Sequence, residues 1–525
     1  MKPTLARTAV AAVTSGLFAP WGAGVQAAGI DPDLEAAMRS GGDVAVIVQF
    51  ADQVDLDAFR GRGEGRGARL AALLSALRTQ ADASQKTAVQ LLQAGGARRI
   101  VELWSINALA ATAGPDVIRN LAALPEVESI TLDATLAAPS PQPAAAVAPE
   151  WNLNAVGVPT LWGQGLTGAG TVVAGMDTGV DVLHPDLAGR WRGGANSWYD
   201  PNGEHATPYD RSGHGTQTLS VAVGGEAGGS AIGVAPGAQW IAVKIFNDAG
   251  VAELSDIHQG FQWLLDPDGN PVTADTPDVV NSSWGFPDLA GQCYLEFEND
   301  LKVLKAAGIA VVFSAGNQGA GGQPSTSVSP GNNPSGFAVG AVDSSLAVAS
   351  TSSRGPSACD GSVFPEVVAP GVGVKTADLT LGGYSPNSYA TLNGTSFAAP
   401  HVAGTMALLR QAKPDATVAQ LEQAVTAGAT DLGTAGPDNT SGYGLLNAPG
   451  AQQWLATAPP PCVDADGDGY FARANCGTLV DCNDANRAIN PAACDIIGDR
   501  IDQNCDGVDR LKGKACPTSG GGKGR

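Results

Sequence analysis

Basic residues and histidines are scarce in this 525-residue sequence. It holds 30 Lys and Arg against 51 Asp and Glu, which gives a formal net charge of −21, and it holds five His. Nucleic acids and anionic membranes select basic surfaces, so this balance argues against both as partners. Hydrophobic residues make up 44% of the chain, so it can fill several cores, and its length predicts two or three domains.

Long apolar runs are absent after the first residues. Lys2 and Arg7 precede an uncharged apolar stretch over 9–25, which ends at the small-residue site Val25-Gln26-Ala27. This arrangement is typical of a secretory signal peptide, which we place at 1–27. The other interpretation, a membrane anchor, needs about 20 uninterrupted apolar residues, and a proline and several glycines interrupt this stretch. We therefore expect an exported protein, located outside the cell, in the periplasm or at the cell surface.

Cysteine is rare until the end of the chain. Cys293 and Cys359 lie in the middle, and the other six cysteines lie between Cys462 and Cys516. Export makes disulfides possible, although the sequence does not give their pairing. We expect a small disulfide-rich module over 458–516, followed by a flexible tail over 517–525.

Residues 28–136 have the pattern of a small α+β domain. Its expected elements are a strand over 44–50, a helix over 69–93, strands within 99–111, a helix over 116–124 and a strand over 127–132. This order is typical of a split βαβ sandwich. The following residues are almost only Ala, Pro, Ser, Gln and Val, so we expect an exposed, cleavable linker over 137–150.

Residues 151–457 alternate short apolar runs with helical patterns. Four runs, over 171–176, 240–245, 278–281 and 309–313, are continuously apolar or nearly so, as strands buried on both faces must be. The alternation predicts an α/β domain in which helices cover both faces of a parallel sheet.

Polar residues at the ends of buried strands are the first site candidates, because ligands gather at the carboxyl ends of strands in an open parallel sheet. Asp177 directly follows the first apolar run, His214 lies between two glycines, and Ser396 begins an apolar helical run. Taken singly, Asp177 and Ser396 are equally typical of turns or helix caps. The other histidines lack flanking glycines and are expected to be structural or solvated: His184, His205, His258 and His401.

The order of these three residues distinguishes between hydrolase classes. The G-x-S-x-G pattern of α/β-hydrolases is absent at Ser396, because Ala398 occupies the last glycine position. In this chain the order is Asp, then His, then Ser. This order differs from that of the α/β-hydrolases, although the same triad geometry recurs with it. The start of a helix also places the Ser396 hydroxyl where backbone N–H groups can stabilise an oxyanion.

The motifs Asp177-Thr-Gly, His214-Gly-Thr and Gly394-Thr-Ser-Phe-Ala-Ala-Pro-His resemble the three active-site motifs of the subtilases. The resemblance covers 151–455, and the unit before it resembles a subtilase propeptide. It implies a subtilisin-like fold and a serine endopeptidase acting through an acyl-enzyme. Ser396 would attack the peptide carbonyl, His214 would take its proton, and Asp177 would fix the imidazole tautomer. We expect protein or peptide substrates, a monomer, and a self-processed precursor inhibited by its own propeptide.

The resemblance also implies an oxyanion donor and two substrate walls. Asn317, after the strand over 309–313, would donate to the oxyanion together with the Ser396 backbone N–H. The walls would be Ser283, Trp284 and Gly285 on one side and Ser314, Ala315 and Gly316 on the other. Extended substrate would add between them as a strand. Trp284 stands where the family often has Leu, so the resemblance does not give the size of the pocket.

The C-terminal module carries an acidic repeat. Asp464, Asp466 and Asp468 alternate with small residues, as in the first half of an EF-hand loop, but Asn475 stands where that loop needs its bidentate Glu. The module resembles small bacterial metal-binding repeats rich in Asp and Cys, which implies structural calcium; catalysis would need no cofactor. A solvated acidic linker stapled by disulfides is the other interpretation. Residues 266–271 are expected to form a surface loop, with no sequence basis for a calcium role.

Two other functions fit parts of the pattern. One is a catalytically inactive subtilase fold that binds a partner, with the C-terminal module as an adhesion surface. A binding protein needs none of Asp177, His214, Asn317 and Ser396 in register, which argues against it. The other is a carboxyl-serine peptidase of the sedolisin kind, which also has a Gly-Thr-Ser nucleophile but uses Glu as base. The His214-Gly-Thr motif argues against this class.

Overall fold

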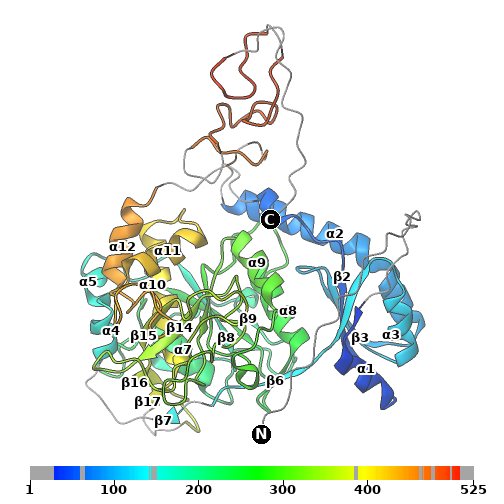
Figure 1. Cartoon of the computed structure of the whole chain (residues 1–525). Coiled ribbons are helices and arrows are strands. Elements are labelled where there is room, and N and C mark those ends of the chain that lie inside the picture. The colour runs from blue at the N-terminus through cyan, green and yellow to red at the C-terminus, as the bar shows by residue number, and fades with distance from the viewer. Residues whose placement is uncertain are drawn as a thin grey trace, which may run out of the picture.

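The computed structural model describes residues 29–59, 66–140, 142–143, 150–383, 388–459, 464, 466, 468–473, 479–496 and 499–508. The signal peptide, half of the linker (141 and 144–149) and the final tail of the sequence analysis lie outside the described residues. Figure 1 shows an N-terminal unit in blue and cyan, a larger central domain, and a C-terminal module in red that stands apart from both. Within the described ranges, no helix is long and apolar enough to cross a membrane.

The N-terminal unit is a five-stranded sheet with helices. Its elements are β1 (Gly29–Ile30), α1 (Pro32–Arg39), β2 (Val44–Phe50), η1 (Leu56–Phe59), α2 (Arg66–Ala94), β3 (Arg98–Leu103), β4 (Ala108–Ala113), α3 (Pro115–Ala122) and β5 (Val127–Leu132). The strand order is β1-β5-β2-β4-β3. The elements expected from the sequence are present, and α1 is an addition. Asp31 caps α1 by accepting from the Asp33 and Leu34 N–H groups, with Pro32 at its first position.

The central domain contains the predicted parallel sheet. Its strands are β8 (Val172–Asp177), β9 (Trp198–Tyr199), β10 (Gln239–Lys244), β12 (Val279–Ser282), β13 (Ala310–Ser314), β14 (Ala338–Val342) and β15 (Val367–Pro370). They lie in the order β15-β14-β13-β12-β8-β10-β9, and neighbouring strands are parallel. The α/β prediction for this domain is confirmed.

Helices and smaller strands surround this sheet. The helices are α4 (Trp151–Ala155), α5 (Val158–Gly163), α6 (Pro185–Ala188), α7 (His214–Val223), α8 (Leu254–Leu265), α9 (Glu298–Ala306), α10 (Thr395–Ala412), α11 (Val418–Gly428) and α12 (Ala448–Thr457), with the short turns η2 (Ala195–Ser197) and η3 (Pro287–Leu289). The smaller strands are β6 (Thr135–Ala137), β7 (Gln142–Pro143), β11 (Val251–Glu253), β16 (Val372–Ala377) and β17 (Tyr389–Asn393).

Alternate residues of each central strand enter two separate cores. In β13, Ala310 and Val312 pack in a core with helices α7, α10, α11 and α12. Val311 and Phe313 of the same strand pack in the other core, with α8 and α9. Successive side chains of a strand point to opposite faces of a sheet, so helices cover both faces, which explains why the run is apolar without alternation.

Helix α2 packs in two cores, that of the N-terminal unit and one of the two cores on the central sheet. Its C-terminal half packs Ala88 and Leu92 in the core of the N-terminal unit. Its N-terminal half packs Leu70, Leu73 and Leu77 in the core that contains α8 and α9. Figure 1 accordingly shows α2 reaching from the N-terminal unit to α9. The N-terminal unit is therefore docked on the central domain through a shared apolar core.

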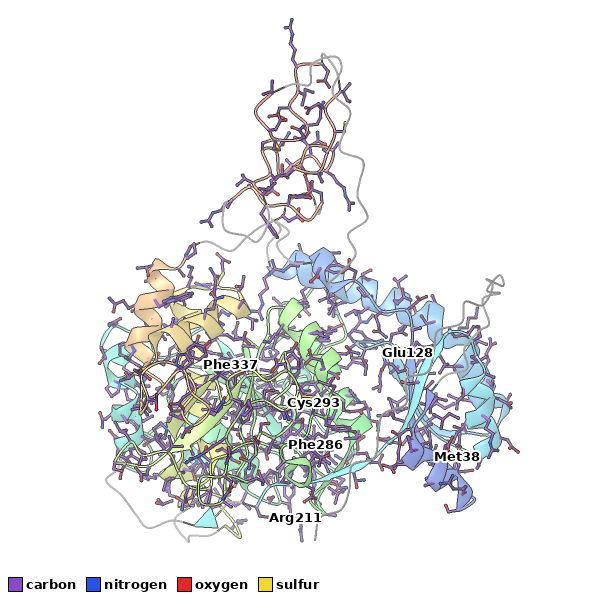
Figure 2. The ribbon with its side chains drawn as sticks, in the orientation of Figure 1. Met38, Glu128, Arg211, Phe286, Cys293 and Phe337 are labelled. Atoms are coloured by element: carbon purple, nitrogen blue, oxygen red, sulfur yellow. A yellow bond between two sulfur atoms is a disulfide. The ribbon has the colours of Figure 1, made fainter. Side chains whose placement is uncertain are left out.

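Disulfides staple the middle and the end of the chain. Cys293, labelled in Figure 2 near Phe286, is bonded to Cys359. In the C-terminal module, Cys482 is bonded to Cys505, and Cys494 is also in a disulfide. The described residues of this module form turns and bends with one isolated bridge between Phe471 and Val480, so the module depends little on regular secondary structure.

A buried charged cluster lies between α8 and α9. The His258 side chain is 1% exposed, and its Nδ1 and Nε2 lie 2.8 Å from Asp300 Oδ2 and 3.2 Å from Glu296 Oε1. Burial opposes the charged imidazolium, but the two carboxylates outweigh it and raise the pKa of His258 to about 10. His258 is therefore held as a cation at neutral pH, as a structural group rather than a solvated one.

We expect this cluster to make the protein less stable in alkali. The folded protein keeps a proton that the unfolded chain, with a His pKa of about 6.5, releases. The free energy of unfolding should therefore fall by up to about 1.4 kcal/mol per pH unit between pH about 6.5 and about 10. Thermal unfolding measured across this range should show the slope in wild type and lose it in His258→Gln. The partly exposed His205 gives the control, since His205→Gln should keep the slope. Equal slopes for wild type and His258→Gln would contradict the assignment.

Candidate active site

The first and second sequence candidates are hydrogen-bonded. Asp177 is the last residue of β8, and its Oδ1 lies 2.8 Å from Nδ1 of His214, the first residue of α7. Asp177 is 2% exposed and His214 is fully buried. His214 Nε2 has no hydrogen-bond partner among the described residues. With Nδ1–H donated to the carboxylate, Nε2 is the nitrogen left to accept a proton.

Glycines let α7 approach the end of β8 closely enough for this bond. A Cβ at Gly215 would lie 2.2 Å from the Gly179 carbonyl oxygen and 3.1 Å from the Asp177 Cβ. Gly213, with φ of +89°, turns the chain into the helix in a conformation that side chains disfavour. The glycines on both sides of His214 therefore have a steric reason.

Asp210 holds the same turn, and sequence reasoning missed it. Its Oδ1 accepts the Gly213 N–H at 2.8 Å, and its Oδ2 accepts the Thr216 N–H at 2.9 Å. Its Oδ1 also accepts from the Thr178 hydroxyl at 3.0 Å, which ties the turn to the end of β8. An acidic residue just before a glycine-flanked helix start was the available signal, because such residues satisfy unpaired N–H groups.

Ser396 lies at the start of α10 and lines the same cleft as His214. Its hydroxyl donates to the Ser283 carbonyl oxygen at 3.2 Å and is not hydrogen-bonded to His214 Nε2. The Ser283 hydroxyl in turn donates to the Ser396 carbonyl oxygen at 2.8 Å. The structure thus brings the nucleophile candidate to the cleft, with its hydroxyl turned toward the wall formed by the residues after β12.

Asn317 lies after β13, and the oxygen of its side-chain amide is hydrogen-bonded. Its Oδ1 accepts the Thr395 N–H at 2.9 Å and the Thr395 hydroxyl at 3.0 Å. With the oxygen occupied, the exposed Nδ2 group is presented to the cleft, which Asn317 lines beside Ser396. An N–H donor next to the candidate nucleophile is the arrangement that an oxyanion requires.

The cleft has a volume of about 670 Å³. Of the expected wall residues, it is lined by Ser283, Trp284 and Gly285 on one side and by Ser314 and Gly316 on the other. Ala315 is fully buried and does not line it. These residues lie at or just after the carboxyl ends of β12 and β13, which are parallel neighbours in the sheet, so the two walls lie side by side at one edge of it.

The Trp284 side chain does not enlarge or fill the pocket. The residue is 2% exposed, and its Nε1 donates to the Met176 carbonyl oxygen at 2.9 Å. Its ring packs edge-on against Phe297 and Phe313 in the core with α8 and α9. Val328 also lines the cleft, where a Cβ on Gly285 or Gly316 would lie 2.9 or 2.5 Å from its side chain.

Part of the expected linker occupies the cleft region. β6 pairs antiparallel with β11, Ala138 continues by donating to the Gly250 carbonyl oxygen at 2.7 Å, and residues 137–140 line the cleft with Ser396. Two residues further on, β7 pairs antiparallel with β17, whose last residue, Asn393, also lines the cleft. Residues 137–140 therefore lie along the cleft that contains the candidate nucleophile.

The acidic residues of the C-terminal module also converge. One oxygen from each of Asp466, Asp468 and Asp481 lies within 4.8 Å of the others, and Asp464 and Asp466 form a similar group with Asp484. Asp481 is 3% exposed, and its Oδ2 has no hydrogen-bond partner among the described residues. Burial and nearby carboxylates raise the pKa of Asp481 above its ordinary value. Asp481 Oδ1 accepts the Asn483 N–H at 2.7 Å, so one buried oxygen of this carboxylate is left unpaired, which fits a hard cation such as calcium.

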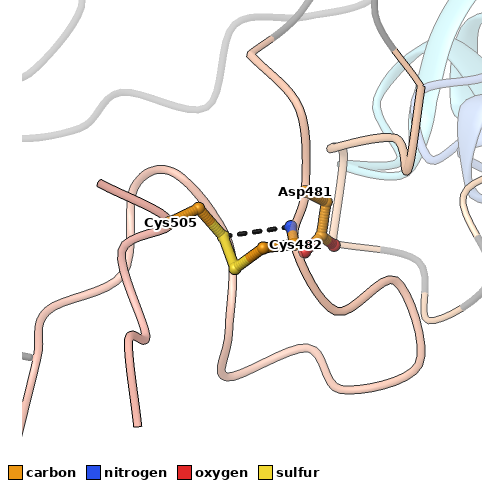
Figure 3. A group of neighbouring side chains, drawn as sticks. All are labelled: Asp481, Cys482 and Cys505. Atoms are coloured by element: carbon orange, nitrogen blue, oxygen red, sulfur yellow. Dashed lines mark hydrogen bonds between the residues drawn. A yellow bond between two sulfur atoms is a disulfide. The ribbon is translucent and has the colours of Figure 1, made fainter. Parts of the chain in front are cut away.

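Sequence reasoning did not identify Asp481 as part of this group. Figure 3 shows it beside the disulfide between Cys482 and Cys505, where the Cys482 N–H donates to Cys505 Sγ at 3.1 Å. This disulfide fixes the segment that carries Asp481. The residue lies 13 positions after Asp468, so only folding brings them together.

Comparison with known proteins identifies the family of this chain. The sequence profile described as the Subtilase family matches residues 168–444. The chain is 35% identical over 412 residues to Bacillopeptidase F from Bacillus subtilis (strain 168), covering 72% of this chain but only 28% of that larger protein. It is 36% identical over 304 residues to Subtilisin E from the same organism, covering 58% of this chain and 71% of that protein.

A third relative, Subtilisin Savinase from Lederbergia lenta, is 36% identical over 302 residues, which are 57% of this chain and 97% of that protein. The matched family segment contains Asp177, His214 and Ser396 together with the whole parallel sheet. The chain therefore belongs to the subtilase family of serine-type endopeptidases.

Proposed function

We propose that Asp177, His214 and Ser396 form the catalytic triad of a secreted endopeptidase, and that Asn317 supplies one oxyanion donor. The 2.8 Å contact between Asp177 and His214, in the same cleft as Ser396, is the observation that supports this most directly. The contact fixes the imidazole with Nε2 free to act as base. If the Ser396 hydroxyl rotated away from Ser283, it could donate its proton to His214 Nε2.

The reaction would then follow from these groups. Ser396 Oγ would attack the substrate carbonyl while its proton passes to His214 Nε2, and the carbonyl oxygen would become negative. Asn317 Nδ2 and the Ser396 backbone N–H would hold that oxygen. The same His214 proton would be given to the leaving amine, which leaves an acyl-enzyme for water to hydrolyse. Substrate would lie extended between the segments that follow β12 and β13.

We further propose that residues 28–136 are a propeptide, that 137–150 are the linker cut by the enzyme itself, and that 151–457 are the peptidase domain. The extended run of residues 137–140 along the cleft supports this, because it has the position that a substrate would take. The apolar core shared between α2 and the peptidase domain supports a tightly docked inhibitor. Export would follow from the signal peptide expected over 1–27.

Self-processing gives a direct test of this function. Ser396→Ala protein should accumulate at the size of the precursor, because the linker lies in a cleft that has lost its nucleophile. Wild type should appear as the shorter mature chain, and residues 28–149 supplied separately should inhibit that mature enzyme. Gel electrophoresis and mass spectrometry of proteins made in a host without other exported proteases provide the measurement.

A matched variant separates loss of the nucleophile from loss of structure. Thr405→Val removes a buried hydroxyl from the same helix, α10, and that hydroxyl has no hydrogen-bond partner among the described residues. It should be processed like wild type. Normal processing of Ser396→Ala in the same host would show that another enzyme cuts the linker.

For the C-terminal module, we propose a structural calcium site built from Asp464, Asp466, Asp468 and Asp481. The unpaired, buried Asp481 oxygen supports it. The module has few aliphatic side chains to bury, so disulfides and a cation would supply its stability. It would add no catalytic group, because the candidate triad and oxyanion donor all lie before it.

A further inference from the structure

A second carboxylate cluster lies in the peptidase domain, at a loop for which no cation was expected from the sequence. Asp266 caps the end of α8, Asp268 follows two residues later in an exposed loop, and Asp275 lies just before β12. One oxygen from each lies within 4.8 Å of the others. Like charges at this separation repel, so a positive group at the cluster would stabilise the loop.

Two of these carboxylates are buried and incompletely paired. The Asp266 side chain is 1% exposed and Asp275 is 9% exposed, and the Oδ1 atoms of both have no hydrogen-bond partner among the described residues. Asp275 Oδ2 accepts only from Asn196 Nδ2, at 3.0 Å. Buried anionic oxygens without donors indicate a missing ligand.

Two arginines approach the cluster, and only one of them pairs with a carboxylate of it. Arg192 donates to the backbone carbonyl oxygens of Asp275 and Asn196, rather than to a carboxylate. Arg78, on α2 of the N-terminal unit, is ion-paired with Asp266 Oδ2, and its guanidinium also lies 4.5 Å from the centre of the Trp104 ring. The cation at Asp266 is thus supplied by the unit proposed as the propeptide.

We propose that Asp266, Asp268 and Asp275 form a calcium site whose affinity the propeptide controls through Arg78. The donors are all carboxylate oxygens, which select a hard divalent cation, and the exposed Asp268 gives it access to solvent. While the propeptide is docked, Arg78 neutralises part of the cluster and competes with calcium. When the propeptide leaves, Asp266 loses its partner and calcium can replace it.

The two binding events are therefore coupled and reciprocal. Arg78 lowers calcium affinity, so calcium must weaken propeptide docking by the same factor. After export into a medium that contains calcium, the protein would release its propeptide more readily than in a medium without calcium. This part rests on the propeptide role proposed above, whereas the calcium site itself does not.

Calorimetric titration with calcium chloride tests the site in full-length Ser396→Ala protein. Asp466→Asn, added because both acidic groups of the C-terminal module share this residue, should leave one saturable site. Adding Asp268→Asn should weaken that remaining site at least tenfold, because it removes one of three charged ligands from an exposed position where folding is not at risk. Asp288→Asn, an exposed aspartate on η3 outside the cluster, should leave it unchanged. Equal calcium affinity with and without Asp268→Asn overturns the site.

The control by the propeptide is tested in the same protein. Arg78→Gln should tighten calcium binding about tenfold, within the usual range of coupling between sites. Arg119→Gln, which removes a surface ion pair with Asp116 elsewhere in the propeptide, should not. Unchanged affinity in Arg78→Gln overturns the coupling. Electrophoresis of the titrated samples shows whether the propeptide is still attached, so failure of the precursor proposal is seen separately.

Discussion

Ser396→Ala should lower turnover on a peptide substrate by on the order of a millionfold, the scale known for triad serines in subtilisin. The loss is this large because no other group in the cleft can form the acyl-enzyme. The fold should survive, since the Ser396 hydroxyl makes a single 3.2 Å hydrogen bond and serves no helix cap. Deleting such a bond costs about 1 kcal/mol of stability.

Activity and labelling together measure this effect. A fluorophosphonate should modify wild type and the Thr405→Val control but not Ser396→Ala, and circular dichroism should be the same for all three. If purified Ser396→Ala kept more than about a hundredth of wild-type activity, Ser396 would not be the nucleophile. Labelling of the wild type would also separate an enzyme from a subtilase fold that only binds.

Asn317→Ala should lower kcat by roughly a hundred to a thousandfold, with a much smaller change in KM. The amide oxygen is anchored by Thr395, so Nδ2 is already oriented when negative charge develops on the substrate oxygen. A donor that acts mainly on the developing charge contributes to the transition state rather than to substrate binding.

A neighbouring amide in the same cleft provides the comparison. Gln318 lines the cleft too, but its Oε1 accepts the Asn317 N–H at 2.7 Å, so its side chain is turned to the backbone. Gln318→Ala should keep kcat close to that of wild type. A rise in KM with unchanged kcat in Asn317→Ala would mean that the amide binds the substrate and the transition state equally well, so it would not be an oxyanion donor.

Local patterns were enough to predict much of the fold. The apolar runs that became β8, β10, β12 and β13 were predicted because strands buried on both faces leave a continuous signal. The same patterns missed α1, which is short and carries only Leu34 and Met38 into a core. Its signal was instead the capping residue and the proline at its start.

The candidate triad was accessible to sequence reasoning because each member follows a local feature: a strand end, a glycine-flanked helix start and a second helix start. The strand ends also located both walls of the cleft. Which way each wall residue points was not accessible. Trp284 was named for the pocket and Ala315 for the facing wall, yet both side chains enter cores, because side-chain direction depends on what packs behind the strand.

The sequence by itself therefore determined the parallel sheet, the order of the candidate catalytic residues and the acidic character of the last module. Each of these depends on periodicity or on neighbours in the chain. Only the tertiary structure decided that Arg78 meets Asp266, 188 positions away, and that Asp481 joins Asp466 and Asp468. Ion pairs and clusters of this kind form between segments whose approach is set by the shared cores and disulfides, and no local pattern records that approach.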